Sequence, residues 1–138
     1  MKFYSTDGKL RNLKNPRKYH IDWEASSRSK FQKSVKDFLY PYWSSDVVFE
    51  EFKVVGSRLS LDFYNANKKI AIEVQGAQHT KYVKHFHKNR FKFLDQLKRD
   101  QKKLDFCEMN DIKLVGYTQM TLSISHFLKT KTFTYEQR

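Results

Sequence analysis

The spacing of apolar residues predicts helices and strands in alternation along most of this chain. Between residues 29 and 40, apolar side chains recur at intervals of three and four, which is typical of one face of a helix. These positions are Phe31, Val35, Phe38 and Leu39. Ser29 opens the segment with the S-x-x-Q form of a capping box, and we expect Pro41 to end the helix.

Three strands are predicted to follow this helix. Residues 47–55 are rich in Val and Phe, and residues 58–64 and 69–75 both alternate between apolar and polar side chains. A turn centred between Ala66 and Asn67 would pair Leu61 with Ile72 in the last two strands. That register places the apolar side chains of this hairpin on one face.

The remaining pattern completes a single domain. We expect a long basic helix or helix pair over residues 81–109, a strand over residues 112–117 and a short amphipathic helix over residues 120–128. The order α-β-β-β-α-β-α predicts an α/β fold with a mixed β-sheet flanked by helices. This core would span residues 29–128, followed by a polar tail over residues 129–138. A basic N-terminal arm would precede it over residues 1–28, where Gly8 and the Asn15–Pro16 pair are expected to break any regular element.

Composition adds a preferred partner to this outline. The chain has 138 residues, of which 27 are Lys or Arg and 15 are Asp or Glu, so its formal charge is +12. Such an excess favours a polyanion, because neutralised phosphates release counterions. DNA is therefore the expected partner. An anionic membrane surface is the alternative, but the long basic segment lacks the clean apolar side that such binding needs.

Other features of the composition indicate the compartment. No apolar run approaches the roughly 18 residues that span a bilayer, and residues 1–13 lack the apolar core of a signal peptide. Cys107 is the single cysteine, so no internal disulfide can form. We therefore expect a cytoplasmic protein.

Acidic side chains on the second and third predicted strands form the main candidate site. In the expected register, Asp62 and Glu73 are diagonal neighbours with Cα atoms roughly 7–8 Å apart, and Gln75 points the same way. Two carboxylates with room for water suit Mg²⁺, which can activate water and stabilise a phosphoryl oxyanion. The alternative is an ordinary strand face on which both carboxylates are solvated.

The long helix contributes a third carboxylate. Asp100 falls on the apolar stripe of this helix, where burying an unpaired carboxylate would be costly. The other members of the stripe are Phe93, Leu97, Leu104 and Cys107. Asp100 is therefore expected to be functional or to form a buried ion pair, for example with Arg99.

A histidine follows the third strand. An imidazole at His79, close to a bound metal, could act as a general acid or base near neutral pH, and a hydrogen-bonded loop histidine is the alternative. A zinc site that also uses His85 and His87 is disfavoured, because the chain has neither paired cysteines nor a His-Glu-x-x-His pattern.

Taken in order, these residues resemble a nuclease family. Asp62, ten intervening residues and then Glu73-Val74-Gln75 resemble the core of the PD-(D/E)xK nucleases, with Gln75 in the place of the lysine. The run from residue 72 to His79, together with residues 99–103, resembles the very-short-patch-repair branch. That branch includes phage homing endonucleases described by an E-D-x-H-D pattern. The resemblance covers about residues 29–117.

The resemblance implies a role for each matching residue. Asp62 would be the central metal ligand, Glu73 could be a second, and the backbone carbonyl of Val74 would complete the coordination. His79 would be the catalytic histidine and Asp100 the final aspartate of the pattern.

Two departures from the family pattern concern other positions. Gln32 stands where the first helix of the family carries a glutamate, and Glu24, Glu50 or Glu51 could substitute. Lys103 could supply a positive charge in place of the missing strand lysine.

These inferences predict a Mg²⁺-dependent DNA endonuclease, with Mn²⁺ able to substitute. Homing, mismatch-nicking and branched-DNA roles fit equally well, in the host cytoplasm if a phage encodes the protein. Dimerisation would help so short a chain to recognise a long site. The alternative is a non-catalytic nucleic-acid-binding module derived from a nuclease. The residues expected to hold the DNA backbone are Lys9, Arg11, Lys14, Arg17, Lys18, Lys84, Lys88, Arg90 and Lys92.

Overall fold

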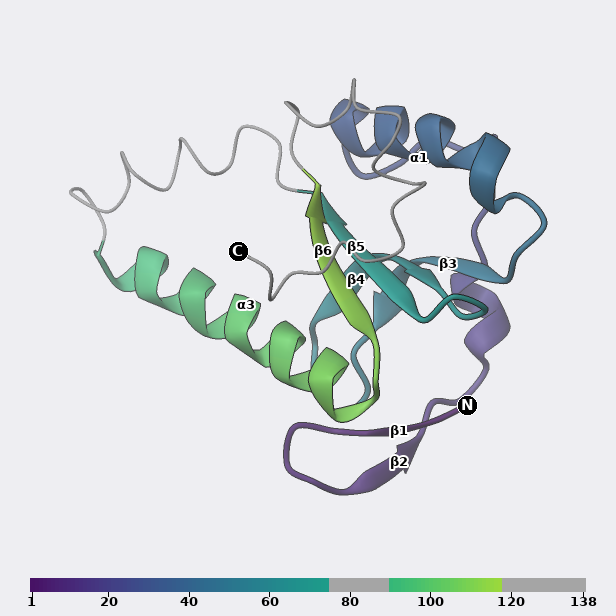
Figure 1. The fold of residues 1–138 in the computed structure, drawn as a ribbon. Helices are drawn as coiled ribbons and strands as arrows, with labels where there is room; N and C mark the ends of the chain where they lie inside the picture. Colours follow the sequence, from purple (N-terminus) through teal and green to yellow (C-terminus); the bar gives the residue numbers. More distant parts are fainter. Residues whose placement is uncertain (75–89, 118–138) are drawn as a thin grey trace.

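The computed structural model of the chain describes residues 1–74 and 90–117 (Figure 1). These residues form a small N-terminal hairpin, a larger sheet and two α-helices. The elements in chain order are β1 (Lys2–Tyr4), β2 (Leu10–Asn12), the 3-10 helix η1 (Pro16–Tyr19), α1 (Lys30–Trp43), β3 (Val48–Lys53), β4 (Ser60–Asn65), β5 (Ile70–Val74), α3 (Arg90–Met109) and β6 (Lys113–Tyr117).

The larger sheet has the strand order β3-β4-β5-β6. Its first three strands are antiparallel neighbours, whereas β6 is parallel to β5. A parallel pair needs a crossover connection, and α3 lies within it (Figure 1). The predicted mixed sheet and its four strands are therefore confirmed.

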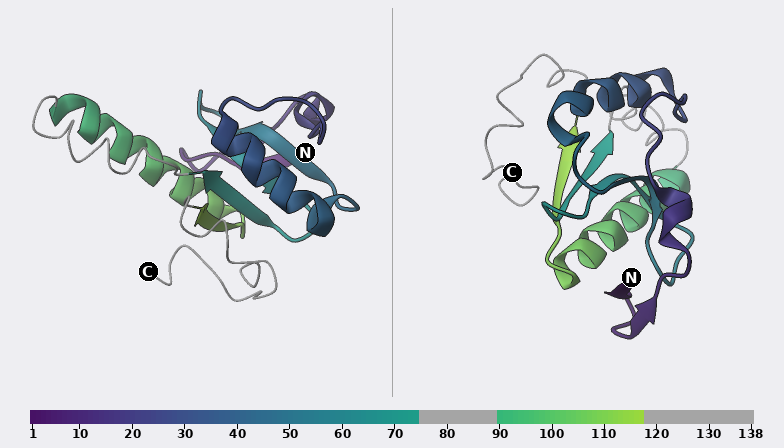
Figure 2. Two further views of the ribbon diagram at one scale, coloured as in Figure 1. Left: turned by 90° about the horizontal axis from the view of Figure 1, so that it is seen from above. Right: turned by 90° about the vertical axis from the view of Figure 1, so that its right-hand side faces the viewer.

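Two apolar clusters lie against this sheet. In the first, which we call the α1 cluster, Val35 and Leu39 of α1 pack with Phe63 and Ile72. In the second, which we call the α3 cluster, Phe106 of α3 packs with residues from β1, β3 and β4. The two views of Figure 2 show α1 and α3 on opposite sides of the sheet, with the N-terminal part of α3 extending beyond it. Burial of apolar area in these clusters is the main stabilising contribution.

Helix α1 begins as predicted but ends later. Ser29 caps the helix by accepting a hydrogen bond from the backbone N–H of Gln32 at 3.0 Å. Pro41 lies inside the helix, which continues to Trp43, so the prediction that Pro41 ends it is wrong. Trp43 is buried in the α1 cluster, and this packing offsets the backbone hydrogen bond that proline cannot donate.

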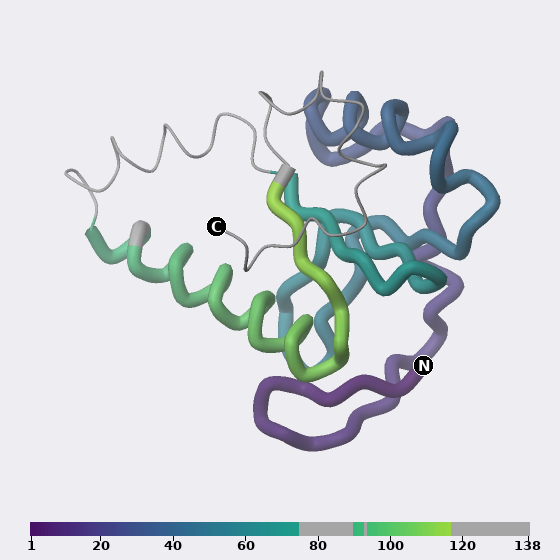
Figure 3. Tube along the Cα trace, viewed as in Figure 1, coloured from purple at the N-terminus to yellow at the C-terminus, as the bar shows by residue number. Residues whose placement is uncertain are grey.

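The expectation that no regular element forms near the N-terminus is also wrong. Gly8, at φ 84°, lies in the turn that joins β1 to β2, so it allows the hairpin instead of breaking it. Phe3 is buried in the α3 cluster. Tyr4 and Asn110 exchange two hydrogen bonds, from the Tyr4 N–H to Asn110 Oδ1 at 2.8 Å and from Asn110 Nδ2 to the Tyr4 carbonyl at 2.9 Å. The hairpin thus lies beside the C-terminal end of α3, as the tube in Figure 3 shows.

The register between β4 and β5 differs from the prediction by two residues. Phe63, not Leu61, pairs with Ile72. The turn is therefore centred one position further along the chain, and Lys69 in it adopts a positive φ of 55°. This shift carries Asp62 to the position facing Glu73, instead of the diagonal position expected from the sequence.

Among the described side chains of the apolar stripe of α3, those near its C-terminal end are buried. Leu104 and Cys107 lie in the core, whereas Leu97 is 49% exposed. The N-terminal part of α3 extends beyond the edge of the sheet (Figure 2). No helix in the described ranges is long and apolar enough to cross a membrane. Residues 81–89 of the expected long helix or helix pair lie outside the described residues. The expected helix over residues 120–128 and the polar tail lie outside them as well.

Candidate active site

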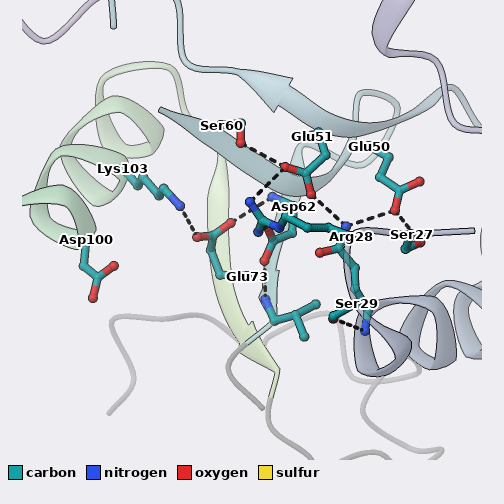
Figure 4. Close-up of polar contacts among 12 residues, drawn as sticks. Ser27, Arg28, Ser29, Glu50, Glu51, Ser60, Asp62, Glu73, Asp100 and Lys103 are labelled. Atoms are coloured by element: carbon teal, nitrogen blue, oxygen red, sulfur yellow. Dashed lines mark hydrogen bonds and ion pairs between the residues drawn. The ribbon is translucent and has the colours of Figure 1, made fainter. Parts of the chain in front are cut away.

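The site is built around Asp62 on β4 and Glu73 on β5. The β4–β5 ladder ends at Phe63 and Ile72. At the next pair, Asp62 and Glu73, the side-chain carboxylates accept the backbone hydrogen bonds. Glu73 Oε2 accepts a hydrogen bond from the Asp62 backbone N–H at 2.8 Å, and Asp62 Oδ2 accepts one from the Val74 N–H at 2.8 Å. Figure 4 shows the side chains of Asp62 and Glu73 close together, with Lys103 beside Glu73. Asp62 is buried and Glu73 is partly buried.

Helix α3 supplies a cation to this pair. Lys103 Nζ donates to Glu73 Oε1 at 2.6 Å, and both side chains are largely buried. The prediction that Lys103 brings a positive charge from the helix agrees with this geometry.

The prediction that Asp100 is a core-facing carboxylate is wrong. Its side chain is exposed and accepts a hydrogen bond from Gln96 at 2.9 Å. Arg99 contacts Gln96 instead of Asp100. Leu97, three residues before Asp100, is also 49% exposed, so this part of α3 does not face the core. Figure 4 shows Asp100 one turn from Lys103, and its charge helps to raise the pKa of both Glu73 and Lys103.

Burial and mutual repulsion change the protonation of the carboxylates. Burial, together with the charge of Glu73, raises the pKa of Asp62 to about 7. Burial also raises the pKa of Glu73, although Lys103 opposes the rise. Burial alone would lower the pKa of Lys103, but the adjacent Glu73 reverses this and leaves it raised. A pair of buried carboxylates with these properties favours a bound cation.

Two consecutive glutamates of β3 contact the same side chain of α1. Side chains that follow one another in a strand normally point to opposite faces, yet Gln32 Nε2 donates to Glu50 Oε2 at 2.9 Å and to Glu51 Oε2 at 2.8 Å. Glu51 adopts a left-handed φ of 52°, which breaks the alternation. Strained conformations of this kind occur preferentially at functional sites.

The neighbouring apolar residues show the same break in the alternation of side chains. Residues three positions apart point to opposite faces of a regular strand, but Phe49 and Phe52 both lie in the α3 cluster. Leu61 and Tyr64 of β4 repeat this spacing in the same cluster, while Phe63 lies in the α1 cluster. Asp62 is therefore at the point where β4 changes faces.

A buried lysine neutralises Glu50. Lys36 Nζ lies 2.8 Å from Glu50 Oε1 and donates to the carbonyl of Asp22 at 2.9 Å. Glu50 also accepts a hydrogen bond from Ser27 Oγ at 2.7 Å. This network holds Glu50 away from Asp62, so Glu51 is the β3 carboxylate that adjoins it; its charge contributes to the raised pKa of Asp62.

Arg28 covers the open side of the site. Its Nη2 donates to Asp62 Oδ1 at 2.9 Å and its Nη1 lies 3.3 Å from Glu51 Oε1. Ser60 Oγ donates to the same Glu51 oxygen at 3.2 Å. Together these contacts complete the polar cluster in Figure 4.

The structure assembles part of the predicted site. Asp62, Glu73, Lys103 and Gln32 come together, whereas Gln75 and His79 lie outside the described residues. The N–H of Val74 is used by Asp62, and its carbonyl stays a predicted ligand.

The predicted DNA-binding residues are distributed over the N-terminal region and the start of α3. Lys84 and Lys88 lie outside the described residues. Arg11 forms an ion pair with Asp7 at 2.6 Å, and Lys18 lies over the Tyr19 ring, 5.1 Å from its centroid. The side chains that are exposed are Lys9, Arg11, Lys14, Arg17, Lys18, Arg90 and Lys92.

Sequence reasoning missed Arg28, Lys36 and Ser27. Lys36 follows Gln32 by four residues and adjoins Val35, so both polar residues share the buried face of α1 with the apolar stripe. The position of Lys36 beside the apolar stripe of this helix could therefore have indicated a buried, paired lysine. Arg28 precedes the helix cap, and only the tertiary structure brings it to Asp62.

The oxygen donors fit a hard divalent cation. Asp62 and Glu73 offer carboxylate oxygens from adjacent strands, the donor type that Mg²⁺ prefers. The cations now in contact with them, Arg28 and Lys103, occupy one oxygen of each. Within residues 1–74 and 90–117, no group of three or more His, Cys, Asp or Glu side chains is already arranged as a metal site.

The chain is similar to three viral proteins, each described as uncharacterized. It is 36% identical to protein 307L of Invertebrate iridescent virus 6 over 73 residues, which is 53% of this chain and 37% of that protein. It is 39% identical to protein 094L of Frog virus 3 (isolate Goorha) over 75 residues, or 54% and 48% of the two chains. It is 29% identical to protein 033L of Invertebrate iridescent virus 3 over 93 residues, or 66% and 48%.

The chain thus spans less than half the length of each of these curated relatives. No family model matches the chain, and no solved structure matches it.

Proposed function

We propose that this protein is a metal-dependent DNA endonuclease with a site of the PD-(D/E)xK type. The observation that carries the proposal is the Asp62–Glu73 pair. Two buried carboxylates from adjacent strands each accept a backbone hydrogen bond from the other strand, and Lys103 contacts one of them. An acidic site in a chain of charge +12 suits the joint binding of a cation and a polyanion.

Asp62, Glu73 and the carbonyl of Val74 would hold Mg²⁺ or Mn²⁺. When bound, the ion supplies a Lewis acid and lowers the pKa of coordinated water. Lys103 holds Glu73 in place through its 2.6 Å contact and opposes the rise that burial causes in the pKa of this carboxyl. His79 is proposed as the group that transfers the proton. Asp100, which lies one turn from Lys103 on α3, is proposed as a residue that orients His79.

Basic side chains would bind the DNA backbone. The exposed lysines and arginines of the N-terminal region and the start of α3 carry no sequence information themselves, but they set the position of the duplex. A homing or nicking role in the host cytoplasm is the narrower proposal, and the similar proteins are all viral. Recognition of a long site would be helped by a homodimer.

One observation favours a second candidate, a nucleic-acid-binding module without catalysis. Gln32 replaces the glutamate expected on the first helix and uses its amide to tie Glu50 and Glu51 together. A chain that has lost this carboxylate could keep its DNA affinity and lose cleavage.

Plasmid cleavage at low salt separates the two candidates. Supercoiled, mismatched and branched DNA are incubated with Mg²⁺ or Mn²⁺, with EDTA as the metal-free reference. The variants are Asp62→Asn, His79→Ala and, as a control, Asp95→Asn, which removes an exposed carboxylate on α3. We expect nicking by the wild type and Asp95→Asn, and losses of at least about a hundredfold in the other two variants.

The opposite result would support the binding module. It consists of tight, salt-sensitive DNA binding by all four proteins with no metal-dependent cleavage of any substrate. The slope of log K for DNA binding against the logarithm of the salt concentration then gives the number of phosphates that the protein neutralises.

A further inference from the structure

Arg28 bridges a carboxylate of β3 and a carboxylate of β4. Its guanidinium contacts Glu51 and Asp62 at once, at 3.3 and 2.9 Å. Asp62 is nearly inaccessible, with 5% of its side chain exposed, whereas 62% of the Arg28 side chain is exposed. A largely exposed cation therefore caps a buried carboxylate.

The contact competes directly with metal binding. The Asp62 oxygen that Arg28 occupies is Oδ1, because Oδ2 accepts the Val74 N–H. A divalent cation on Asp62 Oδ1 would have to displace the guanidinium, since two cations cannot share one oxygen at contact distance without strong repulsion. Because most of the Arg28 side chain is already exposed, its displacement needs no unfolding of the core.

The displaced guanidinium would lie beside the N-terminal end of α1, where an anion is favoured. Arg28 directly precedes Ser29, the N-cap of α1, and the N-terminal end of a helix carries a partial positive charge that favours anions. Figure 4 shows the Arg28 side chain crossing in front of Asp62 from the start of α1. A DNA phosphate that approaches the metal on Asp62 would pass this arginine, whose planar fork suits phosphate oxygens.

We propose that Arg28 is an exchangeable counter-ion that neutralises Asp62 while no divalent cation is bound and contacts a DNA phosphate once a cation has replaced it. This inference rests on the proposed function, because it assumes that Asp62 binds the metal. It adds a residue that sequence reasoning did not identify and couples metal binding to DNA binding.

The first test is Mn²⁺ binding in the absence of DNA, followed by electron paramagnetic resonance at about pH 8, where arginine stays charged. The variants are Arg28→Gln, Arg28→Lys, Asp62→Asn and the matched control Arg58→Gln, which removes an exposed arginine. Arg28→Gln should bind Mn²⁺ about three- to tenfold more tightly than the wild type, the range expected for a lost competing ion pair. Arg58→Gln should match the wild type, and Asp62→Asn should lose the site.

The second test is binding of a duplex of about 20 base pairs, with and without Mn²⁺, its intactness checked on a denaturing gel. With Mn²⁺, Arg28→Gln should bind DNA about three- to tenfold more weakly than Arg58→Gln. It should also lose about 0.9 from the slope of log K against log salt, the value for one phosphate contact. Without Mn²⁺ the two variants should be equal.

The outcomes distinguish this inference from the proposed function. If Mn²⁺ binding depends on Asp62 but is unchanged in Arg28→Gln, the exchange is refuted while the metal site stands. An equal loss of DNA affinity with and without Mn²⁺ also refutes it, because Arg28 would then be a permanent phosphate contact. If Mn²⁺ binding does not depend on Asp62, both proposals fail. Arg28→Lys, which keeps the charge but not the fork, should lie between wild type and Arg28→Gln.

Discussion

Asp62 and Glu73 each accept a hydrogen bond from the backbone of the other's strand, at the point where the β4–β5 ladder ends. The two carboxylates thus take the place of the next ladder hydrogen bonds. Satisfying backbone N–H groups with carboxylates keeps both side chains at defined positions. The cost is that two negative charges are buried side by side.

The first prediction follows from this cost. The pKa of Asp62 is about 7 in the folded protein, against 3.8 for an ordinary aspartate. A raised folded pKa contributes stability that is fully present below pH 3.8 and is lost as the pH rises through about 7. Metal-free protein should therefore lose on the order of a few kcal/mol of unfolding free energy between pH 4 and pH 8.

Urea denaturation at several pH values measures this loss. Asp62→Asn should make the profile distinctly flatter, because the amide does not titrate. Added Mg²⁺ should reverse the trend, since metal binding requires deprotonated carboxylates. Metal-free wild-type protein that becomes more stable from pH 4 to pH 8 would contradict the assignment.

Lys103 is predicted to stabilise the fold through Glu73. Lys103→Met should lower the free energy of unfolding by about 3 kcal/mol, because it leaves a largely buried carboxylate without its cation. The double variant Lys103→Met/Glu73→Gln should recover most of this loss. Lys102→Met, which changes the exposed neighbour, should stay within about 0.5 kcal/mol of wild type. A double variant as unstable as Lys103→Met alone would show that packing, not charge, explains the effect.

Lys36 is expected to be the most sensitive residue of the network on α1. It is fully buried and pairs with Glu50 at 2.8 Å. Lys36→Met should cost about 3–5 kcal/mol in thermal or urea unfolding, and a second change, Glu50→Gln, should restore part of it. Lys30→Met, an exposed change on the same helix, serves as the reference. Similar effects at both lysines would rule out a specific role for the pair.

Gln32→Glu tests why the first helix lacks the glutamate of the family pattern. Gln32 donates to both Glu50 and Glu51, so a glutamate there would remove two donors and add a third negative charge. We expect metal-free stability to fall by about 2 kcal/mol or more, with Gln32→Met intermediate. Denaturation and plasmid cleavage are measured together. A stable Gln32→Glu protein with higher cleavage activity would mean that Gln32 is merely a lost ligand.

Part of the candidate site was predictable from residue types and local spacing. Asp62 and Glu73 stand on segments whose period-two alternation marks them as strands, and Lys103 lies on a helix with a clear apolar stripe. Their mutual approach was predicted only roughly, because the expected register was wrong by two residues. Moving the centre of the turn by one position changes every partner across the hairpin, and Lys69 in this turn has a positive φ of 55°.

Other features had weak or misleading local signals. Pro41 and Gly8 are residues that usually interrupt regular structure. The buried Trp43, two residues after Pro41, and the buried Phe3, on the strand before Gly8, anchor a helix and a hairpin at these places. Asp100 fitted the helical stripe, yet its side chain is exposed. Helical periodicity describes one helix and says nothing of how far its neighbour extends.

The sequence by itself determined the positions of the four main strands, the start of α1, the C-terminal part of the α3 stripe and the residue types available for a cation site. These depend on interactions within a few positions along the chain, namely alternation, helical spacing and capping. Only the tertiary structure decided the β4–β5 register, the left-handed turn at Glu51, and the contacts of Arg28 with Asp62 and of Lys36 with Glu50. Those contacts join residues 14 and 34 positions apart, and their formation depends on the packing of α1 against the sheet, which no local pattern encodes.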